Sequence, residues 1–170
     1  HRAAGQDWTG QDWSAYAWRA VFADGGGRAS VLQTHSTATA ALLAGLEAAT
    51  RAYAGVKLST DDLVHGDFLP ENVLVLDGRV TAVIDFAQAG CGTRAIDLAH
   101  VLAWWHDEID SPLRIRLSDR IRDISGEAGL AICLQVLDMV AYVIAHYSPE
   151  SVEHAVRVGW QLLTHVQAAS

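Results

Sequence analysis

An Asp77-Gly78 dipeptide between two short apolar runs, residues 73–76 and 79–84, places the firmest constraint on how this chain can fold. Asp-Gly supplies the positive φ angles that a two-residue hairpin turn requires, and both runs have the length of ordinary strands. The pattern therefore predicts a β-hairpin over residues 73–84. Because both arms are largely apolar, we expect the hairpin to be buried against another part of the protein.

The polar residues at the open end of this hairpin have a spacing that suggests chemistry. If the register set by the turn continues, Asn72 lies opposite Val83, and Asn72 and Asp85 project from the same face as diagonal neighbours. Amide and carboxylate oxygens with open coordination positions suit Mg²⁺ bound together with substrate phosphates. Asp67, in the loop just before the hairpin, is then free to take a proton from a hydroxyl group.

The segments on either side of the hairpin carry a recognisable motif. Residues 65–72 read His-Gly-Asp-Phe-Leu-Pro-Glu-Asn, and residues 84–86 read Ile-Asp-Phe. Together they resemble the catalytic core of the protein-kinase-like superfamily, where a His-x-Asp-x-x-x-x-Asn loop precedes a hairpin and a metal-binding Asp. The glycine after the histidine, the Ile-Asp-Phe segment and the Asp-Leu-Ala sequence at 97–99 are similar to the aminoglycoside phosphotransferase family. Residues 90–94 depart from the Gly-Asp-Pro often found in that family.

The resemblance implies a role for each matching residue. Asp67 corresponds to the catalytic base that orients the acceptor hydroxyl, and Asn72 and Asp85 correspond to the ligands of the Mg²⁺ that accompanies the nucleotide, ATP or GTP. His65 and Asp97 are expected to hold the loop from beneath by hydrogen bonds. The implied reaction is phosphoryl transfer to a hydroxyl of a small molecule, such as an aminoglycoside-like antibiotic, with antibiotic resistance as its consequence.

Two parts that this chemistry needs are missing from the sequence. The superfamily covers the nucleotide with a glycine-rich loop and a strand lysine. Here Gly25-Gly26-Gly27 is not followed by such a strand, and Lys57, the only lysine, follows a helical segment. The chain also begins with His1 rather than methionine. We therefore interpret residues 1–170 as the C-terminal, helical lobe of a larger kinase, with the N-terminal lobe absent and little activity of its own.

Apolar residues at helical spacing predict a mostly α fold around the hairpin. One helix is expected from about Ser36, a plausible N-cap, to Tyr53, and further helices are expected across residues 95–170. The latter begin at about 95, 111, 127 and 148. Residues 1–30, which contain Trp8, Trp13 and Trp18, are expected to form a surface segment held to the core by its aromatic rings.

Composition and charge restrict the partners. The net charge of −8 argues against nucleic acid and favours a cationic acceptor, for which the acidic residues Asp107, Glu108 and Asp110 are candidate contacts. We expect no membrane segment, because polar residues interrupt the longest apolar run. Two cysteines are too few for a disulfide framework, which favours the cytoplasm.

Two other readings of the same residues remain open. A non-catalytic kinase-like binding module would keep the fold without the nucleotide lobe, but it has no physical need for Asp67, Asn72 and Asp85 together. A metal-dependent hydrolase would use His65, Asp67, Asp85, His100 and His106. It is disfavoured, since no two histidines are three or four residues apart, as a helical ligand pair requires.

Overall fold

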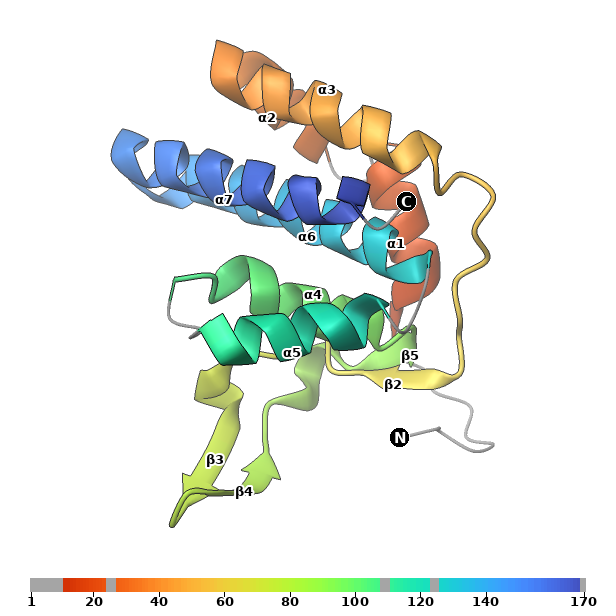
Figure 1. Cartoon of the computed structure of the whole chain (residues 1–170), viewed down its shortest axis with the longest axis vertical. Helices are drawn as coiled ribbons and strands as arrows, with labels where there is room; N and C mark the ends of the chain where they lie inside the picture. Colours follow the sequence, from red (N-terminus) through yellow and green to blue (C-terminus); the bar gives the residue numbers. More distant parts are fainter. Residues whose placement is uncertain (1–10, 24–26, 108–110, 123–125, 169–170) are drawn as a thin grey trace.

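The computed structural model describes residues 11–23, 27–107, 111–122 and 126–168 (Figure 1). Its helices are α1 (Trp13–Phe22), α2 (Arg28–His35), α3 (Thr37–Arg51), α4 (Ala95–Trp104), α5 (Ser111–Arg122), α6 (Glu127–His146) and α7 (Pro149–Ala168). Its strands are β1 (Gln11–Asp12), β2 (Asp62–Val64), β3 (Val73–Leu76), β4 (Arg79–Val83) and β5 (Gly90–Gly92). Short 3₁₀ turns cover Pro70–Asn72 and Phe86–Gln88. The predicted fold class, mostly α with a small hairpin, is confirmed.

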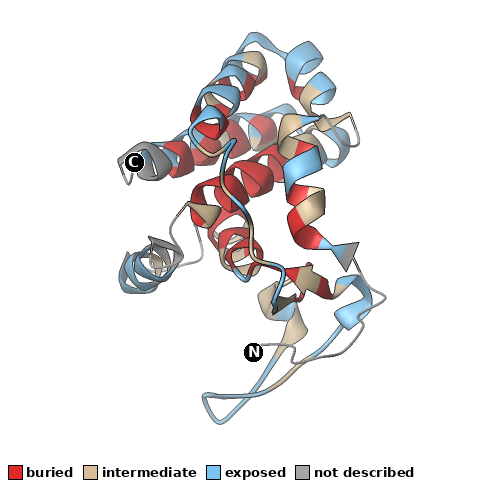
Figure 2. Ribbon diagram, turned by 90° about the vertical axis from the view of Figure 1, so that its right-hand side faces the viewer, coloured by how far each residue is buried: buried red, intermediate tan, exposed pale blue. Residues whose placement is uncertain are grey.

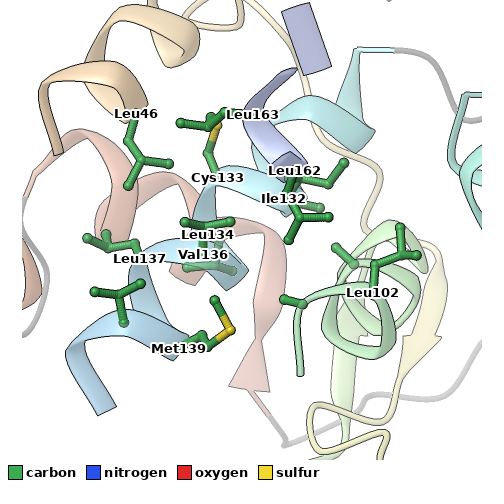
Figure 3. Packing of buried hydrophobic residues seen from close by; sticks show 14 of the residues in the cluster. Leu46, Leu102, Ile132, Cys133, Leu134, Val136, Leu137, Met139, Leu162 and Leu163 are labelled. Atoms are coloured by element: carbon green, nitrogen blue, oxygen red, sulfur yellow. The ribbon is translucent and has the colours of Figure 1, made fainter. Parts of the chain in front are cut away.

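Helix α6 is the centre of the fold. It packs against α1, α2, α3, α4 and α7, and its side chains are buried almost all round from Ala128 to Val140. Figure 3 shows α6 side chains, among them Leu134 and Val136, between Leu46 of α3, Leu102 of α4 and Leu162 of α7. A helix surrounded by other helices must be apolar on every face, which explains the composition of this segment.

Helix α6 also corrects one expectation about membranes. It is long and apolar enough to cross a bilayer by length and composition, whereas we expected no such segment. In the fold, 67% of its most apolar window is buried inside the protein. The apolar character of α6 is therefore accounted for by its position in the core.

The helices predicted from residue 36 onward are confirmed. Ser36 caps α3 in a capping box with Thr39, each side chain bonding the other residue's backbone amide. Two helices that the sequence did not predict, at residues 13–22 and 28–35, lie within or beside the segment 1–30. Trp13 is buried but Trp18 is half exposed, and Trp8 lies outside the described residues. The first turn of α1 is capped by Asp12, whose side chain accepts from the backbone amide of Ala15.

The hairpin forms around the predicted turn, with Asp77 and Gly78 at positive φ and Leu76 paired with Arg79. Its register and burial differ from expectation. A β-bulge shifts the ladder, so Val83 pairs with Val73 rather than with Asn72. The apolar side chains at the tip are exposed, because the hairpin projects away from the helices (Figures 1 and 2).

A second sheet, not predicted, connects distant parts of the chain. Strand β5 pairs in parallel with β1 and antiparallel with β2. Trp13 directly follows β1 and His65 directly follows β2. The sheet therefore brings the start of α1 next to the loop that begins at residue 65.

Candidate active site

The loop that follows β2 is held by a carboxylate on α4. Asp97 accepts the backbone amide of His65 at 2.8 Å through Oδ2 and that of Gly66 at 3.0 Å through Oδ1. Burial raises the pKa of Asp97, and the same two amide hydrogen bonds act in the opposite direction. Both carboxylate oxygens are thus committed to the backbone of the 65–72 loop, which fixes its first two residues.

The imidazole of His65 connects this loop to the end of the hairpin. Its Nε2 lies 2.8 Å from the carbonyl oxygen of Ile84, and its Nδ1 accepts from the backbone amide of Asp67 at 3.3 Å. Because Nδ1 accepts, Nε2 carries the proton and donates to the carbonyl. The ring also packs edge-on against Phe68 and lies 4.7 Å from the ring of Phe86. His65 therefore sets the position of Asp67 relative to the segment that carries Asp85.

Asn72 is directed at Asp67. Its Nδ2 donates to the backbone carbonyl of Asp67 at 2.9 Å and lies 3.4 Å from the carboxylate Oδ2. With the amide nitrogen engaged in this way, the amide oxygen remains as the ligand atom that Asn72 can offer. Asn72 thus links the position of the loop acid to that of an amide oxygen that is available to a metal ion.

Asp85 lies next to the same loop, but its backbone position differs from the one that the predicted hairpin register gives. Because of the bulge, the amide of Ile84 bonds to the carbonyl of Asn72, and Asp85 is the next residue. Asp85 then takes left-handed backbone angles, φ 59° and ψ 60°, at the start of a 3₁₀ turn. Non-glycine residues adopt this conformation rarely, and such residues concentrate at functional sites. The strand ladder therefore ends before Asp85, so a shared strand face does not define its side-chain direction.

The donor set at this place fits Mg²⁺. An exposed carboxylate and a half-buried amide oxygen are hard ligands that leave most coordination positions to water and phosphate oxygens. In the part of the chain that the structure describes, no three or more His, Cys, Asp or Glu side chains form a cluster able to hold a metal ion. Asn72 and Asp85 would therefore hold the ion together with a phosphorylated substrate.

Sequence reasoning missed the contribution of Trp13. Its indole Nε1 donates to the carbonyl of Gln88 at 2.9 Å, just after Asp85. The same ring lies against Gly66, which has φ +82°, so closely that a Cβ on residue 66 would overlap it. The glycine in the His-Gly-Asp motif was the available signal, since it marks a close approach of other atoms to the backbone.

Glu127 was also missed, although it anchors the segments around the site. One of its carboxylate oxygens accepts the backbone amide of Ser59 at 2.6 Å, and the other accepts the hydroxyl of Thr93 at 2.5 Å. Ser59 precedes β2, and Thr93 precedes α4, the helix that carries Asp97. The first turn of α6 thereby holds the two segments that lead to the loop and to its supporting aspartate.

Only part of the predicted acidic cluster can be described. The exposed carboxylate of Asp107 lies 2.8 Å from Nε2 of His154 on α7 and 3.3 Å from Nδ1 of His106. Glu108 and Asp110 lie outside the described residues. Asp107 is therefore already paired with two imidazoles, a contact that the sequence pattern did not suggest.

Comparison with known proteins identifies the family of this chain. A family model described as the phosphotransferase enzyme family matches residues 1–131. This match covers well over half of the chain. The chain belongs to the phosphotransferase enzyme family.

Individual relatives of this family member are aminoglycoside kinases. Hygromycin-B 4-O-kinase from Escherichia coli is 45% identical over 42 residues, which are 25% of this chain and 12% of that protein. The apo structure of a thermostable mutant of aminoglycoside phosphotransferase APH(4)-Ia aligns with a TM-score of 0.65 at 18% identity. A ternary complex of that enzyme with AMP-PNP and hygromycin B aligns with a TM-score of 0.64 at 17% identity.

The coverage of these alignments is unequal. The apo structure covers 86% of this phosphotransferase family member, but only 52% of the solved chain is matched. The chain thus spans about half the length of the solved structures that it resembles. At this level of identity the likeness concerns the fold, and it confirms the kinase-like architecture predicted from the sequence.

Proposed function

We propose that this chain is the catalytic half of an ATP-dependent kinase that phosphorylates a hydroxyl group of an aminoglycoside-like antibiotic. The observation that carries the proposal is the joint placement of Asp67 and Asn72, hydrogen-bonded to each other, beside an Asp85 in a left-handed conformation. Family membership supports the reaction class, since the matching family is one of phosphotransferases.

Each residue has a defined task in this proposal. Asp67 accepts the proton of the acceptor hydroxyl, because among the described residues its carboxylate has one long hydrogen-bond contact, with Asn72, and because it is only half buried. Asn72 and Asp85 hold Mg²⁺, which neutralises phosphate charge when the nucleotide is bound. His65 and Asp97 keep the loop in place through the hydrogen bonds described above. Phosphoryl transfer is largely a matter of positioning, so this rigid support is part of the catalytic apparatus.

The nucleotide pocket is completed, in this proposal, by another part of the protein that packs over the hairpin. Apolar side chains of the hairpin and of the segment after it are exposed: Leu74, Val75, Leu76, Val80, Ile84 and Phe86. An exposed apolar patch of this kind is typical of a surface that a partner covers. The chain matches only about half of the solved structures' length, which supports a covering lobe. One of those structures contains AMP-PNP and another contains ADP, which favours ATP over GTP.

The acceptor is proposed to be a cationic aminoglycoside. The E. coli relative is a hygromycin-B kinase, and the solved relatives include complexes with hygromycin B. The net charge of −8 favours a cationic ligand by raising its local concentration. Asp107, Glu108 and Asp110 stay candidate contacts for it, with Asp107 shared between the ligand and its histidines. Cys91 and Cys133 are free thiols, and we place the protein in the cytoplasm.

The decisive experiment is an acceptor screen with the complete protein. Purified protein with ATP and Mg²⁺ is incubated with hygromycin B, other aminoglycosides and neutral or anionic alcohols, and phosphorylated products are identified by mass spectrometry. We expect phosphate on an aminoglycoside hydroxyl. Phosphorylation of neutral alcohols alone would remove the cationic acceptor and keep the kinase. Nucleotide binding without transfer to any acceptor would instead support a binding module.

A further inference from the structure

A buried histidine on α4 has a polar atom that the described part of the structure leaves without a hydrogen bond. His100 is 9% exposed, and its Nε2 has no partner there. Its ring stacks on Trp104, with centroids 5.6 Å apart and planes at 19°. Leaving a buried donor or acceptor unpaired costs about 1–3 kcal/mol, so native proteins rarely keep one without a reason.

His100 lies on the face of α4 that supports the 65–72 loop. Asp97 and His100 are three residues apart, so they lie on the same helix face. Asp97 contacts the amides of His65 and Gly66 from this face. Asp67 is the next residue along the chain, and its negative charge raises the pKa of His100 against the larger, lowering effect of burial. His100 thus lies one helical turn beyond the loop's anchor, within electrostatic reach of Asp67.

The other polar groups of this region are already engaged. Both oxygens of Asp97 accept backbone amides, and both ring nitrogens of His65 have hydrogen-bond partners. Across α4, the indole of Trp104 bonds to the neutral side chain of Gln135 on α6. The carboxylate of Asp67, in contrast, has only the 3.4 Å contact with Asn72 among the hydrogen bonds of the described residues. It is therefore the acceptor best able to satisfy His100.

Burial also determines the charge state in which His100 acts. Burial lowers the pKa of His100 to about 4. The charge of Asp67 raises this pKa, and that of His65 lowers it further. The imidazole is therefore neutral near pH 7 and has a single N–H to donate.

We propose that His100 is a positioning residue for Asp67, whose neutral imidazole donates its Nε2 proton to the Asp67 carboxylate in the reactive conformation. The inference rests on the proposed catalytic role of Asp67. Donation to one carboxylate oxygen aims the other oxygen at the acceptor hydroxyl. It also stabilises the ionised form of Asp67, the form that can accept a proton.

Three variants of the complete protein test the proposal. His100→Phe keeps a ring on Trp104 but removes the donor, and His100→Gln keeps a side-chain N–H. His146→Phe is the matched control, because that exposed imidazole also stacks on an aromatic ring, 4.2 Å from Tyr142. We expect His100→Phe to lower kcat about 10- to 100-fold with little change in KM for ATP. The acid limb of its pH–rate profile should move to higher pH, while His100→Gln and His146→Phe stay near the wild type.

NMR of the His100 ring provides a second measurement that does not depend on enzyme activity. The ¹⁵N signals of the His100 ring should report an Nε2–H tautomer and should shift in Asp67→Asn, whereas those of His146 should not. If the wild type transfers phosphate and His100→Phe is equally active, the inference is overturned and the proposed function stands. If the wild type transfers no phosphate, the proposed function fails, and unchanged His100 signals in Asp67→Asn would then overturn the inference as well.

Discussion

The indole of Trp13 occupies the space that a side chain on residue 66 would need. Helix α1 is therefore packed directly against the loop that carries Asp67, and the Trp13 indole also bonds to Gln88 beyond Asp85. One aromatic ring from the start of the described chain thus contacts both segments of the candidate site. The integrity of α1 is expected to matter for turnover as well as for stability.

Substitution of Gly66 tests this packing. Gly66→Ala introduces a Cβ at φ +82° that would overlap the indole of Trp13 and approach the carbonyl oxygen of Gln88 to 2.7 Å. Strain from the left-handed conformation and overpacking should together lower the free energy of unfolding by about 2–4 kcal/mol. Gly78→Ala is the control, since Gly78 also has positive φ but has nothing within 4 Å of its would-be Cβ.

The control should lose only about 1–2 kcal/mol, because it carries the conformational cost alone. Urea denaturation of the two variants measures the difference. Equal losses of unfolding free energy for Gly66→Ala and Gly78→Ala would mean that the indole of Trp13 moves aside without destabilising the fold.

Removal of the loop carboxylate should affect the chemical step. Asp67→Ala is expected to lower kcat about 10²–10⁴-fold, the usual range for general-base assistance, while KM for ATP changes little. Steady-state kinetics with the complete protein and a phosphorylatable acceptor provide the measurement. Unchanged turnover would remove Asp67 from the mechanism.

Removal of the proposed metal-binding charge should act through Mg²⁺. Asp85→Asn keeps a side chain that tolerates left-handed backbone angles but loses a ligand charge, so turnover at ordinary Mg²⁺ concentration should be abolished. Asp77→Asn is the matched control, because Asp77 is also at positive φ (50°) but lies in the hairpin turn. Activity measured over a range of Mg²⁺ concentrations separates the two. Wild-type activity of Asp85→Asn would contradict the ligand assignment.

Stability should depend on pH through Asp138 on α6. Burial raises the pKa of Asp138 to about 6, although its ion pair with Arg28 and its hydrogen bond from Tyr16 act in the opposite direction. The folded protein therefore holds the proton more tightly than the unfolded chain. The contribution of protonated Asp138 to the free energy of unfolding is present in full below about pH 4 and is lost as the pH rises through about 6.

Asp138→Asn removes this titration and serves as the reference. Between pH 4 and 8 the free energy of unfolding of the wild type, relative to the variant, should fall by about 3 kcal/mol. Denaturation at several pH values measures it, and the comparison cancels contributions from other groups. A difference that stays constant or rises with pH would show that the ion pair with Arg28 outweighs burial.

A lysine introduced into the exposed hairpin should lower the melting temperature only if another part of the protein covers the hairpin. Leu76→Lys and Val80→Lys replace side chains that are each 65% exposed in this chain. In the complete protein we expect each to lower the melting temperature, since a covered lysine loses its hydration. Ile115→Lys on α5, at 61% exposure, is the control and should have little effect. Equal melting temperatures for all three variants would argue against a covering lobe.

Local features of the sequence determined much of this protein. The Asp-Gly turn, the Ser36 cap and the apolar composition of residues 127–146 act over a few residues, and the hairpin turn, α3 and α6 form where they predict. The motif from His65 to Asp97 likewise identified the family, because its spacing is a property of the chain itself.

Tertiary structure decided the rest, because those features depend on contacts between distant residues. Helix α1 is held against the 65–72 loop by Trp13, which packs on Gly66 more than fifty residues away in the sequence. The bulge moved the hairpin register by one residue, and the left-handed backbone of Asp85 ended the strand conformation there. Nε2 of His100 lacks a hydrogen-bond partner among the described residues because the packing of α4 buries it. Pairing, burial and charge environment are properties of the packed molecule, and a local pattern carries no record of them.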